Sequence, residues 1–189
     1  KIILSTPMYH SISFRLIFLP IYLNCSCFIL DSFSATKWIN NIYKHKITFS
    51  ILVADQIEQI SKYINSKKID SLKKLVSCCS PLSLKTKIKL SKVSRLKIFD
   101  TYGASEVGTV TNINLNKEKD KLASNGKITP GFKIKILKNS KFYDKKNFEG
   151  ELCFQTKRVF SKYFYFSDKT DNKIKKNYFI SGDIGYVDQ

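Results

Sequence analysis

Short apolar runs alternate with longer segments of helical periodicity in the first part of the chain. Runs rich in Ile, Leu, Val and Phe, bounded by polar or turn-forming residues, predict buried strands. The expected strands are residues 1–7, 27–30, 47–53, 72–77 and 96–99. The order in which helices separate these strands decides the fold class.

The segments between the strands repeat their apolar residues at helical spacing. Ala35, Trp38, Ile39 and Ile42 fall at i, i+3, i+4 and i+7, and Ser34 before them is a favoured N-cap residue. A first helix, ending near residue 24, is expected to carry Phe14 and residues 16–19 into the core. Further helices are expected over residues 55–66 and, opened by Pro81, over residues 81–92. Strand and helix thus alternate, which predicts an α/β fold with a parallel, doubly wound sheet and flanking helices.

Beyond Val110 the pattern changes to a period of two. Residues 132–137 and 151–156 alternate apolar and polar side chains between glycines, which is typical of antiparallel strands. We therefore expect an α/β subdomain over residues 1–115 and part of a small antiparallel β subdomain over residues 125–189. The aromatic segment 160–166 is interpreted as a core segment rather than a base-stacking platform.

The net charge of +18 raises the question of a nucleic-acid partner. Only Arg15, Arg95 and Arg158 of the 33 basic residues are arginines, and the lysines are spread along the chain. Base and phosphate readers favour the arginine fork, so this composition argues against nucleic acid. It fits an A+T-rich coding sequence, in which Lys, Ile, Asn, Tyr and Phe are all frequent. A basic nucleic-acid-binding module is kept as the alternative from another class, and it predicts one contiguous lysine face.

The cysteine spacing and the longest apolar run bear on where the protein is located, and we expect it to be cytoplasmic. The five cysteines and two histidines lack zinc-site spacing, so reduced thiols are expected. Residues 12–30 are apolar and long enough to span a bilayer, but they contain Arg15 and Pro20. No integral membrane segment is therefore expected.

Candidate chemistry follows the apolar run 96–99. An aromatic ring, a hydroxyl and a carboxylate stand within five residues, in Tyr102, Ser105 and Glu106. A sharp turn is expected at Gly103, between the ring and the two polar groups. These groups can serve a base, a phosphate and a metal ion, respectively. His10 and residues 79–81 also follow expected strands, at the edge where open α/β sheets bind ligands.

The spacing Tyr-Gly-x-Ser/Thr-Glu resembles the core motif of the acyl-adenylate-forming superfamily, which comprises acyl-CoA synthetases, adenylation domains and luciferases. Four further segments stand in the order which that superfamily uses. They are Pro-Met-Tyr-His at 7–10, Ser-Cys-Cys-Ser-Pro-Leu-Ser at 77–83, Gly-Lys-Ile-Thr-Pro-Gly at 126–131 with Gly-Glu-Leu at 150–152, and Tyr-Phe-Ile-Ser-Gly-Asp-Ile-Gly-Tyr at 178–186. The chain departs from the family in carrying cysteines at 78 and 79, where glycines are usual.

The resemblance implies a role for each polar group of the motif. Tyr102 would stack on adenine, Ser105 would donate to the α-phosphate, and Glu106 would hold Mg²⁺. Asp183 would accept hydrogen bonds from the ribose hydroxyls. These residues would make one nucleotide site from segments far apart in the sequence.

The resemblance also implies positions around the base and the acid. His10 would orient the carboxylate substrate and, with Ser105 and Glu106, would form the catalytic group. Asp100 would face the adenine amino group. The other implied ATP- or AMP-binding residues are Cys79, Ser80, Pro81 and Gly103.

The implied reaction is ATP-dependent activation of a small-molecule carboxylic acid as acyl-AMP, followed by transfer to a thiol. The thiol would be coenzyme A or a carrier's phosphopantetheine, and the expected setting is fatty acid metabolism. The family's phosphate loop should then lie upstream of Lys1, and its C-terminal lid domain downstream of Gln189. Alternatives left open are a carrier-loading adenylation domain and a non-catalytic remnant.

Overall fold

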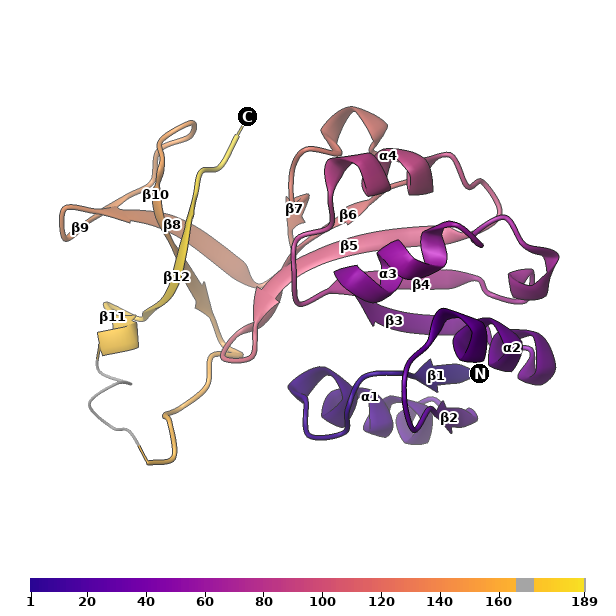
Figure 1. Ribbon diagram of the computed structural model, residues 1–189. Helices are drawn as coiled ribbons and strands as arrows, with labels where there is room; N and C mark the ends of the chain where they lie inside the picture. The colour runs from indigo at the N-terminus through magenta and orange to yellow at the C-terminus, as the bar shows by residue number, and fades with distance from the viewer. Residues whose placement is uncertain (166–171, 189) are drawn as a thin grey trace. The chain divides into compact units, whose positions relative to one another are not determined.

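The computed structural model describes residues 1–165 and 172–188. They form two compact units, the first comprising Lys1–Tyr102 and Thr111–Lys127 and the second comprising Gly103–Val110 and Ile128–Gln189. One seven-stranded sheet has the order β2-β1-β3-β4-β5-β6-β7, and a five-stranded sheet has the order β11-β12-β10-β8-β9 (Figure 1). The seven-stranded sheet consists of β1 (Ile2–Leu4), β2 (Cys27–Ile29), β3 (Phe49–Val53), β4 (Lys74–Cys78), β5 (Lys97–Ala104), β6 (Gly108–Asn114) and β7 (Lys127–Ile128).

The first five strands of this sheet pair in parallel. β1 lies between β2 and β3, and β4 and β5 follow in order. The direction of strand addition therefore reverses at β1, which creates a topological switch point between neighbouring strand ends. The predicted parallel, doubly wound α/β sheet is confirmed.

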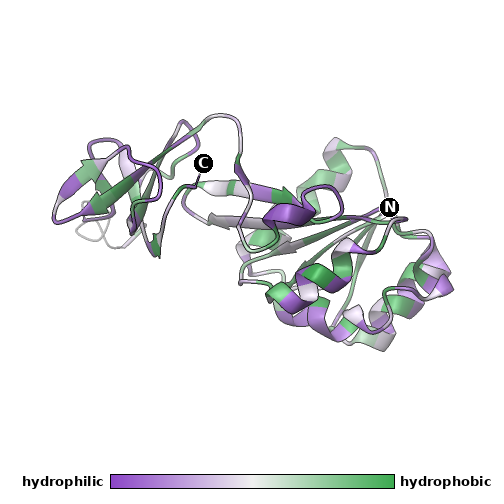
Figure 2. Cartoon of the chain, turned by 90° about the horizontal axis from the view of Figure 1, so that it is seen from above, coloured by the Kyte–Doolittle hydropathy of each residue, from purple (hydrophilic) through white to green (hydrophobic). Residues whose placement is uncertain are grey.

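In the described part of the chain, four α-helices cover the sheet: α1 (Ser11–Tyr22), α2 (Ala35–His45), α3 (Ala54–Ser61) and α4 (Leu84–Ser91). Parallel crossovers are right-handed, so the reversal at β1 places α1 on one face and the other three helices on the opposite face. The core follows this division, because Ile3 packs with Trp38 and Ile57, whereas Ile2 and Leu4 pack with the α1 residue Leu16. Hydrophobic and hydrophilic segments alternate along the helices, as two-faced packing requires (Figure 2).

Serine caps set two of the helix starts. The Ser34 hydroxyl accepts a hydrogen bond from the Lys37 amide at 3.2 Å, which confirms the expected cap of α2. The Ser83 hydroxyl accepts from the Thr86 amide at 3.3 Å, so α4 begins at Leu84. The expected start at Pro81 is wrong, because the capping residue is Ser83 and the helix begins three residues after Pro81.

The first helix buries less than its apolar sequence predicts. Leu16 is buried, but Phe14 and Phe18 are 60% and 54% exposed and pack edge to face on each other at 5.3 Å. They lie four residues apart on the side of α1 away from the sheet, so the expectation that both enter the core is wrong. The expected buried strand at 27–30 is also wrong in part, because β2 is an edge strand and Ile29 is 54% exposed. Among the described residues, the helices are too short or too polar to cross a membrane.

The five-stranded sheet is antiparallel in every pair, as the period of two predicted. Its core includes Cys153, Tyr178 and Ile180, against which Leu137 and Phe142 pack. Its strands are β8 (Phe132–Lys138), β9 (Lys141–Tyr143), β10 (Gly150–Thr156), β11 (Ile174–Lys175) and β12 (Tyr178–Gly185).

A buried ion pair joins α4 to the seven-stranded sheet. Lys87 Nζ lies 2.8 Å from Asp100 Oδ2, and the two side chains are 5% and 6% exposed. The same ammonium donates to the Ser124 carbonyl at 3.0 Å. Removing one partner of such a pair leaves a buried charge without compensation, which costs more than the pair itself contributes.

We expect Lys87→Met to lower the free energy of unfolding by about 3–5 kcal/mol, because Asp100 would remain charged and buried. Urea unfolding followed by circular dichroism measures this change. Lys85→Met, on the exposed side of the same helix, should change stability by less than about 0.5 kcal/mol. Equal losses of unfolding free energy in the two variants would show that burial of the ion pair does not determine the cost of removing Lys87.

Candidate nucleotide-binding site

The motif segment forms the hairpin between β5 and β6. Tyr102 and Gly103 belong to β5, and the connection consists of Ser105, Glu106 and Val107, closed by a 3.2 Å hydrogen bond from the Val107 amide to the Ala104 carbonyl. So short a connection joins antiparallel strands. The expected turn at Gly103 is therefore wrong, since the chain reverses two residues later.

Gly103 is required by close packing rather than by turning. An ideal Cβ at this position would lie 2.1 Å from the carbonyl oxygen of Gly108 on the facing strand. Any side chain there would push the two strands of the hairpin apart. The glycine of the motif thus lets the Ser105–Val107 turn close tightly.

Two hydrogen bonds hold Glu106 from a distant segment of the same unit. The Phe160 amide donates to the Glu106 carbonyl at 2.7 Å, and the Tyr163 hydroxyl donates to Glu106 Oε1 at 2.7 Å. Burial, together with the hydrogen bond to Glu106, raises the pKa of Tyr163 to about 12. Sequence reasoning did not single out Tyr163, although the density of aromatic residues around it was the available signal.

The aromatic segment is only partly a core segment. Phe160 is half-buried and packs on Tyr163 at 4.6 Å and on Phe179 at 6.0 Å. Phe164 and Tyr165 are 84% and 83% exposed, so the expectation of burial is wrong for them. Residue 166, the last of the predicted segment, lies outside the described residues.

Asp183 lies in an irregular part of β12. Glu151 pairs with Ile184 and Cys153 with Ile180, so three residues, Ser181 to Asp183, oppose a single residue of β10. The Asp183 amide donates to the Ser181 hydroxyl at 3.0 Å, and the side chain of Asp183 is exposed. Bulges of this kind re-aim a side chain away from the regular alternation of a strand.

In the first unit, the predicted residues follow strand ends. His10 is the exposed N-cap residue of α1, and the exposed residues Cys79, Ser80 and Pro81 follow β4. These loops begin at the carboxyl edge of the parallel strands, where open α/β sheets bind ligands. Asp100 differs, because its carboxylate is buried against Lys87.

The thiols of this region differ in environment. Cys79 is exposed and has a φ of +71°, a left-handed conformation that favours glycine. Its sulfur lies 3.4 Å from that of the buried Cys78. Burial raises the pKa of the Cys78 thiol, and the neighbouring Cys79 raises it to a smaller extent.

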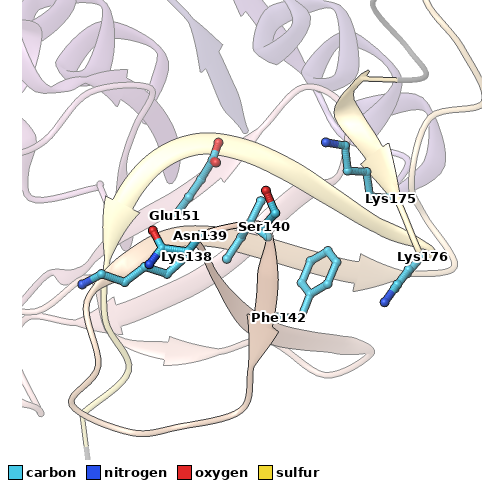
Figure 3. A pocket seen from close by; sticks show the side chains of 8 residues that line it. Lys138, Asn139, Ser140, Phe142, Glu151, Lys175 and Lys176 are labelled. Atoms are coloured by element: carbon cyan, nitrogen blue, oxygen red, sulfur yellow. The ribbon is translucent and has the colours of Figure 1, made fainter.

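A pocket of about 330 Å³ lies elsewhere in the second unit, beside the β8–β9 hairpin and β11. Figure 3 shows Lys138, Lys175 and Lys176 around it, together with Asn139, Ser140, Phe142 and Glu151. None of the predicted nucleotide-binding residues lines it. Across residues 1–165 and 172–188, no three His, Cys, Asp or Glu side chains are grouped to hold a metal ion.

Comparison with known proteins identifies the family. The sequence profile described as AMP-binding enzyme matches residues 1–164. The chain belongs to this family. The match includes the β5–β6 hairpin and Tyr163, and it ends before Asp183.

The AMP-binding relatives include ligases of several acids. The chain is 28% identical over 166 residues to the acyl-coenzyme A synthetase ACSM3, mitochondrial, of Rattus norvegicus, covering 85% of this chain and 28% of that protein. It is 23% identical over 189 residues to the 2-succinylbenzoate–CoA ligase of Bacillus pumilus, covering 99% of this chain and 38% of that protein. The chain thus spans well under half of either relative.

Solved structures of AMP-binding enzymes share the fold. The o-succinylbenzoate CoA synthetase of Bacillus subtilis, in complex with ATP and a magnesium ion, superposes with a TM-score of 0.87 at 18% identity, over 100% of this chain and 39% of that one. The amide bond synthetase McbA of Marinactinospora thermotolerans gives a TM-score of 0.91 at 15% identity, over 100% and 40%. Both the parallel and the antiparallel sheet are therefore part of the shared architecture.

Gly103→Ala is expected to destabilise the protein by more than about 2 kcal/mol, because the added methyl would overlap backbone atoms of Gly108. Gly131→Ala is the matched control, since nothing lies within 4 Å of its added methyl and only its φ of +89° is unfavourable. That control should lose only about 1–2 kcal/mol. Urea unfolding midpoints compare the two, and a smaller loss for Gly103→Ala would contradict the close approach.

Proposed function

We propose that the complete gene product is an ATP-dependent, AMP-forming acid–thiol ligase. The observation that supports this most strongly is the family match over residues 1–164, which spans the hairpin bearing Ser105 and Glu106. In the proposed reaction, a carboxylate oxygen of the acid attacks the α-phosphorus of ATP and the bond to pyrophosphate breaks. The sulfur of a thiol then attacks the acyl carbon of acyl-AMP, and AMP leaves.

The motif residues would position and neutralise the reactants. Tyr102 would stack on adenine, backbone groups of Cys79, Ser80, Pro81 and Gly103 would line the nucleotide, and Asp183 would accept from the ribose hydroxyls. Ser105 would donate to the α-phosphate, and His10 would orient the carboxylate of the acid. Asp100 would face the adenine amino group, and its ion pair with Lys87 would hold it in that position.

Glu106 suits a magnesium ion. A bound Mg²⁺ would neutralise developing charge on the phosphates. This ion takes one or two carboxylates and fills its remaining positions with phosphate oxygens and water. The single half-buried carboxylate of Glu106, without a further acidic cluster in the described residues, fits that mode of binding. Glu106 would hold the ion together with the substrate phosphates.

Coenzyme A is the acceptor that the comparisons favour. The rat and Bacillus pumilus relatives are both named for coenzyme A chemistry. A carrier-loading adenylation domain is the second candidate, and transfer to phosphopantetheine distinguishes it. A setting in fatty acid metabolism and a cytoplasmic location stay predictions. An exchange screen over aliphatic and aryl acids would identify the acid.

We expect Glu106→Gln and Asp183→Ala each to lower ATP–pyrophosphate exchange by the complete gene product about 100-fold, because each removes a preorganised charge at the nucleotide. Glu149→Gln, an exposed carboxylate of the same unit, is the control and should exchange at the wild-type rate. Near-normal exchange in both site variants would refute the assignment. Steeply salt-dependent binding to nucleic acid, without exchange, would support the basic-module alternative.

A further inference from the structure

The side chain of Glu106 is held although it lies in a hairpin turn. Turn side chains are ordinarily free to choose among rotamers, and ordering a glutamate costs conformational entropy. Here the Tyr163 hydroxyl, 57 residues further along the chain, donates to Oε1 at 2.7 Å. Among the described residues, this is the hydrogen bond that fixes the carboxylate.

The same distant segment also fixes the backbone of the turn. The Phe160 amide donates to the Glu106 carbonyl at 2.7 Å, three residues before Tyr163. Glu106 is thus held at its main chain and at its side chain by one short segment. Two attachment points define the direction of the side chain, which a single hydrogen bond does not.

The segment that holds Glu106 is itself anchored in the second unit. The Phe160 and Tyr163 rings pack at 4.6 Å, and Phe160 meets the buried ring of Phe179 edge to face at 6.0 Å and 90°. Phe179 lies in β12, the strand that also carries Asp183. The orientation of Glu106 therefore depends on packing in the five-stranded sheet.

We propose that Tyr163 is a positioning residue that holds Oε1 of Glu106 so that Oε2 is presented to the divalent cation bound with ATP. This inference rests on the proposed function. Mg²⁺ demands nearly ideal octahedral geometry, so a carboxylate with a fixed direction binds it better than a mobile one. Hydrogen bonds to metal ligands have this effect in other sites, and their loss typically costs about 10–100-fold in metal affinity or activity.

A purely structural Tyr163 would act through its ring alone. Tyr163→Phe tests this, because it keeps the ring that packs on Phe160 and removes only the hydroxyl. Tyr165→Phe removes a hydroxyl from an 83% exposed ring nearby and is the matched control. Urea unfolding of both variants shows whether either is misfolded.

The experiment measures Mn²⁺ binding to the complete gene product by electron paramagnetic resonance, with α,β-methylene-ATP as a non-reacting nucleotide. Tyr163→Phe is expected to raise the apparent Kd for Mn²⁺ by about 10–100-fold, with Tyr165→Phe unchanged. In the Glu106→Gln background, Tyr163→Phe should have no further effect, because Tyr163 acts only through Glu106. Wild-type Mn²⁺ affinity in Tyr163→Phe, or an equal loss in both backgrounds, would overturn the inference.

The same measurement separates this inference from the proposed reaction. If no acid supports pyrophosphate exchange but Mn²⁺ binding depends on Glu106 and Tyr163 as expected, the proposed reaction fails and the positioning role stands. If pyrophosphate exchange occurs but Tyr163→Phe leaves the Mn²⁺ affinity unchanged, the proposed reaction stands and the positioning role fails. If Glu106→Gln leaves Mn²⁺ affinity unchanged, the positioning role fails as well.

Discussion

The parallel pairing of β1, β3, β4 and β5 is the constraint on which the chain depends. Parallel strands cannot be joined by tight turns, so each needs a crossover segment, and each crossover begins at the same edge of the sheet. The loop of His10, the Cys79–Pro81 loop and the end of β5 all start there. Residues widely separated in sequence thereby share one edge of the sheet.

Periodicity predicted the elements of this sheet because burial decides them. Trp38 and Ile42 lie on one side of α2 and are both buried, and the same spacing rule placed the other helices to within a few residues. The rule failed where a helix has more apolar surface than the sheet can cover. Phe14 and Phe18 look like core residues in sequence, but only one side of α1 faces a strand, and their exposure follows from geometry that a linear pattern does not contain.

The candidate site also has features that the sequence predicted and features that only the fold shows. The spacing of a short motif was enough to predict Tyr102, Ser105 and Glu106 as site residues, and their roles stay predictions. The contact between Glu106 and Tyr163 joins segments 57 residues apart and obeys no local spacing, so only the folded chain reveals it. The ion pair of Lys87 and Asp100 is similar, since nothing in the sequence distinguishes Lys87 from the other lysines of α4.

The exposure of Cys79 has a practical consequence. All five cysteines of the chain lie in its described part, and Cys79 alone is exposed, whereas Cys78 and Cys153 are buried and Cys25 and Cys27 are half-covered. Alkylating reagents attack accessible thiolates, so Cys79 is the natural point for attaching a single fluorophore. A dye there would report on the edge of the parallel sheet without any engineered cysteine.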